Sequence, residues 1–162
     1  MKTSAAAAMV TDLTPDFSAF LRSLAENSVD YLLIGGYAVA WHGYPRPTGD
    51  LDVWVRPTLE NASRVVEALT AFGFGVASLN AAQFTTPEVV VRMGYVPNRI
   101  EIMSAVSGVS FEDCWPGRVQ STWDGVPVTV IGLDCLHKNK RASGRLKDLA
   151  DLEELPPGSD DA

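Results

Sequence analysis

Two aspartates two residues apart, Asp50 and Asp52, stand in a segment whose apolar residues alternate, which predicts a β-strand over 51–55. Side chains at i and i+2 of a strand point to the same face, about 6.6 Å apart along the backbone at ~3.3 Å per residue. Carboxylates at that spacing can converge on one or two divalent cations, which suit phosphoryl chemistry. The spacing therefore predicts a metal site on this strand.

A glycine pair, Gly35-Gly36, follows the continuous apolar run Tyr31–Ile34, which predicts a buried strand. Glycine lacks a Cβ, so its backbone N–H groups can come close to a phosphate that a side chain would obstruct. The pair predicts a phosphate cradle near the carboxylates, with a tight strand-to-helix turn as the alternative.

The elements that must position these residues follow from apolar periodicity and from turn residues. Helices are expected over 12–26, 37–41, 59–71, 133–142 and 145–155. Strands are expected over 31–34, 51–55, 88–93, 99–103, 120–122 and 128–131. Thr14 before Pro15 predicts a helix start, Gly73 a helix end, and Asp124-Gly125 a hairpin turn. The pattern is that of an α/β protein.

Composition and length indicate one soluble globular domain. The chain has 162 residues, of which 46% are hydrophobic and 20% charged. We expect a flexible N-terminus over 1–11, a single domain over 12–155 and a disordered tail over 156–162. No apolar run approaches the ~20 residues that span a bilayer. The net charge of −7 argues against a general nucleic-acid-coating surface, although 138–147 carries five basic residues and no acidic one.

The two cysteines, Cys114 and Cys135, have no CxxC spacing, and the two histidines, His42 and His137, are not clustered with them. This pattern disfavours a zinc site and predicts two inert thiols in a reduced, cytoplasmic protein without a membrane partner.

Three motifs in order carry a resemblance to a known family. They are Gly35-Gly36, the run Arg46-x-Thr48-x-Asp50-Leu51-Asp52, and the C-terminal run Lys140-x-x-x-Gly144-Arg145-x-Lys147-Asp148-x-x-Asp151. Together with a carboxylate on a later strand, Glu101, they resemble the nucleotidyltransferase superfamily with its polymerase-beta-like palm. The chain is similar in particular to small stand-alone members akin to the AbiEii-type toxins of toxin–antitoxin systems. The resemblance implies a small mixed β-sheet flanked by helices.

The resemblance also implies roles for individual residues. Asp50, Asp52 and Glu101 would form the catalytic triad and hold Mg²⁺, with two ions expected and Mn²⁺ as a substitute. Glu101 stands where the family usually has aspartate, and it could act instead as general base on the incoming hydroxyl. The residues implied in contacting the nucleoside triphosphate are Gly35, Gly36, Arg46, Thr48, Lys140 and Arg145. For Thr48 and Arg46 the alternative is a purely structural role in the loop. For Lys140 and Arg145 the alternative is that they are solvent-exposed residues of a helix pair.

The implied activity is transfer of a nucleoside monophosphate from a triphosphate such as ATP to an acceptor hydroxyl. Acceptors compatible with the resemblance are RNA, including a tRNA end, a protein side chain and a small molecule. A cognate antitoxin or a homodimer is an expected partner. Two alternatives use the same fold: a nucleotide- or protein-binding module with weakened chemistry, and a metal-dependent phosphohydrolase.

Overall fold

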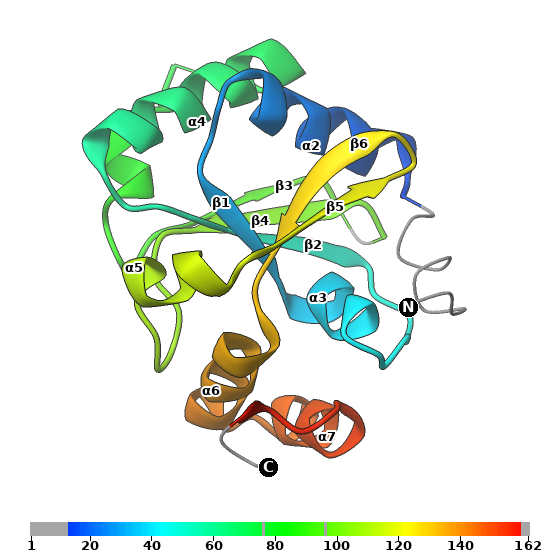
Figure 1. Ribbon diagram of the computed structural model, residues 1–162. Helices are drawn as coiled ribbons and strands as arrows, with labels where there is room; N and C mark the ends of the chain where they lie inside the picture. Colours follow the sequence, from blue (N-terminus) through cyan, green and yellow to red (C-terminus); the bar gives the residue numbers. More distant parts are fainter. Residues whose placement is uncertain (1–12, 76, 96, 160–162) are drawn as a thin grey trace.

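The fold is built on a six-stranded mixed β-sheet, seen in a computed structural model that describes residues 13–75, 77–95 and 97–159 (Figure 1). The strands lie in the order β3-β4-β2-β1-β6-β5. They are β1 (Tyr31–Ile34), β2 (Asp50–Val55), β3 (Val90–Met93), β4 (Arg99–Met103), β5 (Val119–Trp123) and β6 (Val126–Val130). The helices are α2 (Pro15–Glu26), α3 (Gly35–Trp41), α4 (Leu59–Phe72), α5 (Phe111–Cys114), α6 (Leu133–Ser143) and α7 (Leu146–Glu154). Two short 3₁₀ turns, Ala81–Phe84 and Trp115–Gly117, complete the elements.

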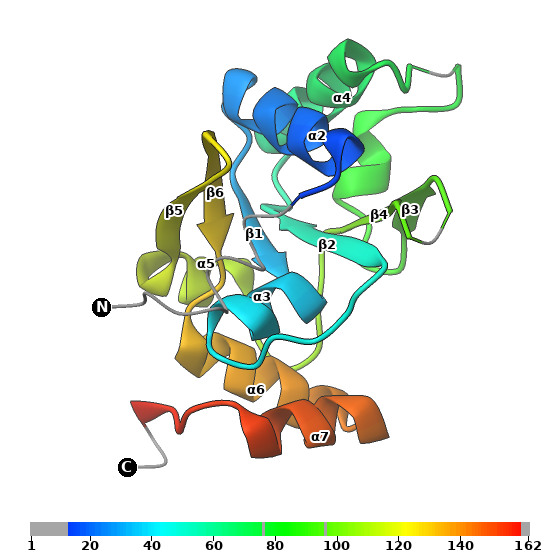
Figure 2. The same cartoon turned by 90° about the vertical axis from the view of Figure 1, so that its right-hand side faces the viewer.

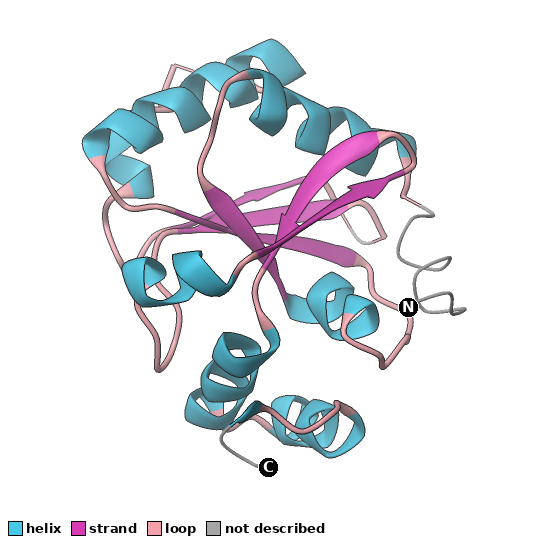
Figure 3. Cartoon of the chain, in the orientation of Figure 1, coloured by secondary structure: helices cyan, strands magenta, loops and turns pink. Residues whose placement is uncertain are grey.

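Helices cover the sheet from both sides (Figures 1 and 3). Helices α2 and α4 lie on one side and contact each other, with the Ser23 hydroxyl donating to the Ala68 carbonyl at 2.7 Å. Helices α3, α6 and α7 lie on the other side, and Figure 2 shows α6 and α7 as a layer below α3. The site described below forms where this second layer meets the ends of the central strands.

Parallel pairing in the centre of the sheet fixes which residues become neighbours. β2 runs parallel to β4, and β1 runs parallel to β6. The other pairs, β1 with β2, β3 with β4 and β5 with β6, are antiparallel. Because β2 and β4 start side by side, the first residues of both strands lie at one end of the sheet.

Helix α2 illustrates how the sequence specifies these elements. Thr14 caps it, since its hydroxyl accepts from the Phe17 N–H at 3.2 Å, and Pro15 fills the first turn. Its buried side chains Phe17, Leu21 and Leu24 recur at helical spacing and enter the core. Both features were predicted from the sequence and are confirmed.

The predicted α/β fold with a small mixed sheet flanked by helices is confirmed, with small differences in boundaries. α3 begins at Gly35 rather than at 37, and β3 begins at Val90 rather than at 88. Gly73 ends α4 in the left-handed conformation, with φ +102°, and Asp124-Gly125 forms the turn between β5 and β6. α5 and the 3₁₀ turns were not predicted, because segments this short have no usable apolar period.

The predicted domain boundaries stay predictions. Residues 1–11, expected to be flexible, lie outside the described residues. Part of the expected tail is described: the Pro156 carbonyl accepts from His137 Nε2 at 2.7 Å, and the Ser159 N–H donates to Asp134 Oδ1 at 2.7 Å. No helix in the described ranges is both long and apolar enough to cross a membrane.

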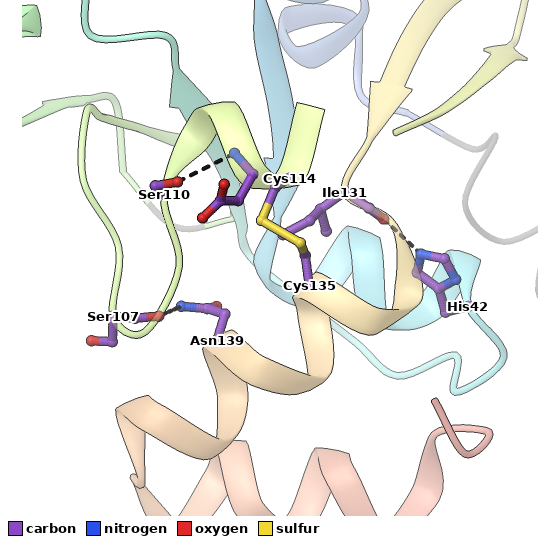
Figure 4. The surroundings of a disulfide bond; sticks show 8 residues. His42, Ser107, Ser110, Cys114, Ile131, Cys135 and Asn139 are labelled. Atoms are coloured by element: carbon purple, nitrogen blue, oxygen red, sulfur yellow. Dashed lines mark hydrogen bonds between the residues drawn. A yellow bond between two sulfur atoms is a disulfide. The ribbon is translucent and has the colours of Figure 1, made fainter. Parts of the chain in front are cut away.

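The prediction of two free thiols was wrong, because Cys114 and Cys135 form a disulfide (Figure 4). Cys114 ends α5 and Cys135 lies in the first turn of α6. The β5–β6 hairpin between them brings the chain back on itself, so residues 21 apart in sequence become neighbours. Sequence spacing carried no sign of this pairing, because it depends on where the hairpin returns.

Reduction of this disulfide should destabilise the protein by about 3 kcal/mol, the loss expected on chain-entropy grounds for a closed loop of about 20 residues. The measurement is urea-induced unfolding with and without a phosphine reductant. Replacing both cysteines, Cys114→Ser with Cys135→Ser, is the control, since its stability should be low and unaffected by reductant. Two titratable thiols in the non-reduced, unfolded wild-type protein would contradict the disulfide.

Candidate active site

Three carboxylates from two adjacent strands converge at one end of the sheet. In the register of β2 and β4, Asp52 pairs with Glu101 and Asp50 with Arg99. Carboxylate oxygens of Asp50, Asp52 and Glu101 all lie within 4.8 Å of one another. Among the described residues this is the one group of acidic, histidine or cysteine side chains with metal-binding spacing. The structure thus brings together the predicted triad.

The triad opens into a cleft with a volume of about 390 Å³. Its walls come from the ends of β1 and β2, from the β3–β4 pair and from α6 and the start of α7. The basic side chains that line it are Arg92, Arg99, Lys140, Arg145 and Lys147. A cleft with acidic residues at the base and basic residues around them can hold a polyanion together with cations.

Of the three carboxylates, Asp52 has the least favourable electrostatic environment for its ionised form. Its Oδ1 is buried and has no hydrogen-bond partner within the described part of the chain. The pKa of Asp52 is raised to about 7, by burial in the first place and then by the negative charges of Glu101 and Asp50, while Lys147 acts in the opposite direction. An orphaned buried oxygen beside two further carboxylates is a site that a cation would stabilise.

The other two carboxylates are paired with arginines. Arg99 donates from Nε and Nη2 to the two oxygens of Asp50, at 2.9 and 3.1 Å. Arg92, from the edge strand β3, donates from Nε to Glu101 Oε2 at 2.6 Å. Asp50 and Glu101 are therefore neutralised by the protein, whereas Asp52 is not.

The residue types fit a hard divalent cation. Mg²⁺ and Mn²⁺ prefer oxygen ligands, and Mg²⁺ is usually bound through one or two carboxylates with several waters retained. The unpartnered oxygen of Asp52 and one oxygen each from Asp50 and Glu101 supply such ligands. The donor set contains no sulfur or nitrogen, which are the usual ligands of structural zinc sites.

The glycine pair has a packing reason that the sequence did not reveal. A Cβ on Gly35, which has φ +69°, would lie 2.1 Å from Asp52 Oδ2. A Cβ on Gly36 would lie 2.7 Å from the Cβ of Thr48. The glycines therefore give space first to Asp52 and Thr48. Gly35 also lines the cleft, where its phosphate contact stays a prediction.

Gly35→Ala should destabilise the protein and weaken divalent-metal binding, because the new methyl group displaces the Asp52 carboxylate. A left-handed backbone costs ~1–2 kcal/mol at a non-glycine residue, and overpacking adds ~1–3 kcal/mol. Gly125→Ala is the matched control, since Gly125 has φ +79° but nothing within 4 Å of its Cβ position. Urea unfolding and Mn²⁺ titration of both variants separate the two costs. Equal losses in both would show that the space beside Asp52 is irrelevant.

Thr48 and Arg46 lie in the loop before β2 and make structural contacts. The Thr48 hydroxyl donates to the Asp50 carbonyl at 3.2 Å and accepts from the Asp50 N–H at 3.4 Å, which fixes the start of β2. Arg46 donates from Nε and Nη2 to the two oxygens of Asp151 in α7, both at 2.9 Å. Arg46 is not among the residues lining the cleft, so the geometry gives its predicted phosphate contact no support.

The C-terminal motif forms a buried ion-pair network. Lys140 Nζ lies 2.9 Å from Asp148 Oδ1 and 3.0 Å from Asp151 Oδ2, and all three residues are buried. Arg145 Nε donates to Asp148 Oδ2 at 2.7 Å. Burial raises the pKa of Asp148, but hydrogen bonds from Arg145, Ser143 and Lys140 outweigh it and lower the pKa to about 2. Lys140 is thus engaged by two carboxylates, whereas the largely exposed Arg145 reaches the cleft.

Sequence reasoning missed three cleft cations, Arg92, Arg99 and Lys147. Arg99 stands two residues before Glu101, so strand alternation already placed it on the same face. Arg92 faces Glu101 across the antiparallel β3–β4 pair. Lys147 belongs to the basic run over 138–147, which was interpreted from the sequence only as a local concentration of positive charge.

Comparison with known proteins was made by sequence and by structure. No protein-family model matches the sequence, and no curated protein does. A protein of Thermotoga maritima assigned as a nucleotidyltransferase has a similar structure, with a TM-score of 0.54 and 16% identity over 83% of this chain and 86% of its own. A nucleotidyltransferase-like antigenic protein from Paracoccidioides brasiliensis has a TM-score of 0.47 and 16% identity, over 88% of this chain and 76% of its own. The first likeness shows that the chain has the nucleotidyltransferase fold.

Proposed function

We propose that this protein is a Mg²⁺-dependent nucleotidyltransferase that moves a nucleoside monophosphate from a nucleoside triphosphate to an acceptor hydroxyl. The observation that carries the proposal is the convergence of Asp50, Asp52 and Glu101 in register on β2 and β4, at the base of a cleft lined with cations. The shared fold supports the same activity, although a fold alone does not determine function.

Asp50, Asp52 and Glu101 would hold the divalent ions, with Mn²⁺ as a substitute for Mg²⁺. Bound metal supplies charge neutralisation for the phosphates and activation of the attacking hydroxyl. Around that centre the basic side chains Arg145 and Lys147 meet the triphosphate, since both line the cleft. Gly35, which lines the cleft, has no side chain of its own, so its backbone can approach the phosphates.

In the reaction, the acceptor oxygen forms a bond to the α-phosphorus, and the bond from that phosphorus to the bridging oxygen of pyrophosphate breaks. The hydroxyl proton passes to solvent water, because Oε1 of Glu101 is assigned to the metal and Oε2 is held by Arg92. Arg145 and Lys147 offset the negative charge that grows on the departing pyrophosphate.

RNA, including a tRNA end, is the acceptor we favour, because the basic run over 138–147 borders the cleft. A toxin of a toxin–antitoxin pair, akin to the AbiEii type, would fit such an activity. A cytoplasmic location was predicted as well, and the Cys114–Cys135 disulfide weighs against it, since disulfides are rare there.

The test is a transfer assay with Mg²⁺ and each of the four nucleoside triphosphates labelled at the α-phosphate. Total RNA, lysate protein or buffer is the acceptor. Label moving to RNA or protein supports transfer and identifies the nucleotide and the acceptor class. Release of the γ-phosphate as inorganic phosphate without labelled acceptor would instead favour the phosphohydrolase. Tight nucleotide binding without turnover would favour the binding module.

A further inference from the structure

Arg99 occupies one of the carboxylates that the proposed function assigns to metal. Its guanidinium makes a two-pronged contact with Asp50, at 2.9 and 3.1 Å, and lies 3.8 Å from Glu101. An arginine guanidinium stays charged in proteins, so the positive charge of Arg99 is permanent. A divalent cation that approaches Asp50 therefore meets a fixed positive charge already bound to both oxygens.

The arrangement differs from an ordinary surface ion pair in its surroundings. The Arg99 side chain is 35% exposed and lies in the wall of the cleft, so it has open space into which to move. Its partner Asp50 is only 25% exposed and is fixed on β2. The movable member of the pair is thus the arginine, whose planar fork matches phosphate as well as carboxylate.

We propose that Arg99 acts as an exchangeable plug: it blocks the metal site until a polyphosphate arrives, then leaves Asp50 for the phosphate oxygens. This inference rests on the proposed function, because it concerns the same metal site. When Arg99 binds phosphate, Asp50 becomes free to bind the cation, and the cation in turn lowers the affinity of Asp50 for Arg99. Metal and triphosphate therefore bind interdependently, and the protein holds little divalent metal in the absence of nucleotide.

Arg92 is a weaker candidate for the same exchange. It contacts Glu101 through one nitrogen only, at 2.6 Å, and its side chain is 59% exposed on the edge strand. Asp52 has no arginine partner among the described residues, so it can already accept a cation. Arg99 is consequently the residue whose removal should change metal binding most.

The experiment measures binding of each ligand alone. Mn²⁺ binding is followed by electron paramagnetic resonance, and inorganic tripolyphosphate binding without metal by calorimetry in a chelator. Arg99→Ala should bind Mn²⁺ roughly tenfold more tightly than wild type and tripolyphosphate roughly tenfold more weakly, as is usual for coupled sites. Arg99→Lys keeps the positive charge and loses the planar fork. Its affinities for Mn²⁺ and for tripolyphosphate should therefore lie between those of wild type and those of Arg99→Ala.

Arg64→Ala is the control for net charge, because Arg64 pairs with Glu60 on the exposed surface of α4, outside the residues that line the cleft. It should leave both affinities unchanged. Equal Mn²⁺ affinity in wild type, Arg99→Ala and Arg99→Lys would overturn the plug and leave the proposed function standing. Absence of Mn²⁺ binding in all of them, with native circular dichroism, would overturn the proposed function together with the plug.

Discussion

Asp52→Asn should reduce nucleotidyl transfer by about 10³-fold or more without unfolding the protein. Metal-based charge stabilisation contributes several kcal/mol to such a reaction, and each ~1.4 kcal/mol is a tenfold change in rate. Asp52 is the carboxylate with an unpartnered buried oxygen, Oδ1, to which no side chain of the described structure donates a hydrogen bond. An amide removes that charge and keeps the shape of the side chain.

The stability of the same variant gives an independent check. Ionised Asp52 lies close to Glu101 and Asp50, and this repulsion and burial raise its pKa to about 7. Since the pKa of Asp52 is raised from the ordinary 3.8 in the folded protein, its ionisation costs stability progressively as the pH rises from about 4 and fully above about 7. At neutral pH the asparagine should therefore leave the metal-free unfolding temperature unchanged or higher. In the presence of tripolyphosphate, Mg²⁺ or Mn²⁺ should raise the unfolding temperature of wild type above its value with tripolyphosphate alone, and should not do so for Asp52→Asn.

Asp50→Asn is the matched variant with a different expected profile. It should also lose transfer, but it removes the partner of Arg99 and therefore lowers stability slightly. Transfer at the wild-type rate in either variant would exclude the triad as the metal site. If a variant loses transfer but metal still raises its unfolding temperature as much as that of wild type, then the metal binds to other residues.

Lys140→Met should lower the free energy of unfolding by about 3 kcal/mol. Lys140 is 3% exposed and bridges Asp148 and Asp151, which are 1% and 3% exposed. Removing one partner of a buried ion pair is strongly destabilising, ~3–5 kcal/mol, because a buried charge loses its compensation. We place the value at the lower end, since Arg145 and Arg46 still contact the two carboxylates.

The control is Lys138→Met, which removes the same charge two residues earlier from an exposed position on α6. Its stability should stay within about 0.5 kcal/mol of wild type, as is usual for surface substitutions. Adding Asp151→Asn to Lys140→Met should recover part of the loss, because one uncompensated carboxylate is removed. If Lys140→Met is as stable as wild type and binds triphosphate more weakly, then Lys140 is a ligand contact and the structural assignment is wrong.

The secondary-structure elements and the carboxylate triad can be predicted from the sequence more clearly than the basic side chains that neutralise the charge of the triad. Alternation within one strand tells that Asp50 and Asp52 share a face and that Glu101 lies on the face opposite Ile100 and Ile102. Turn motifs and caps tell where each element ends. Alternation cannot tell which strand becomes the neighbour. The Arg99–Asp50 pair exists because β4 lies parallel to β2 in one register.

The same limit explains the residues whose predicted and observed contacts differ. Lys140 and Arg46 are basic residues in phosphate-binding motifs, so the sequence suggested a ligand. In the fold each faces a buried aspartate from α7, which no local pattern could indicate. The disulfide was missed for a related reason, since its two cysteines become neighbours only through a hairpin.

The Arg46–Asp151 pair has a consequence for synthesis of the chain on the ribosome. The Arg46 guanidinium, in the loop that leads into β2, receives its carboxylate partner Asp151 from 105 positions later in the chain. During translation the loop before β2 therefore emerges long before α7 exists to hold it. The sheet can be completed once β6 has emerged, whereas the ordered cleft also needs α7, so premature termination within α6 would yield a sheet whose loop before β2 is left unanchored.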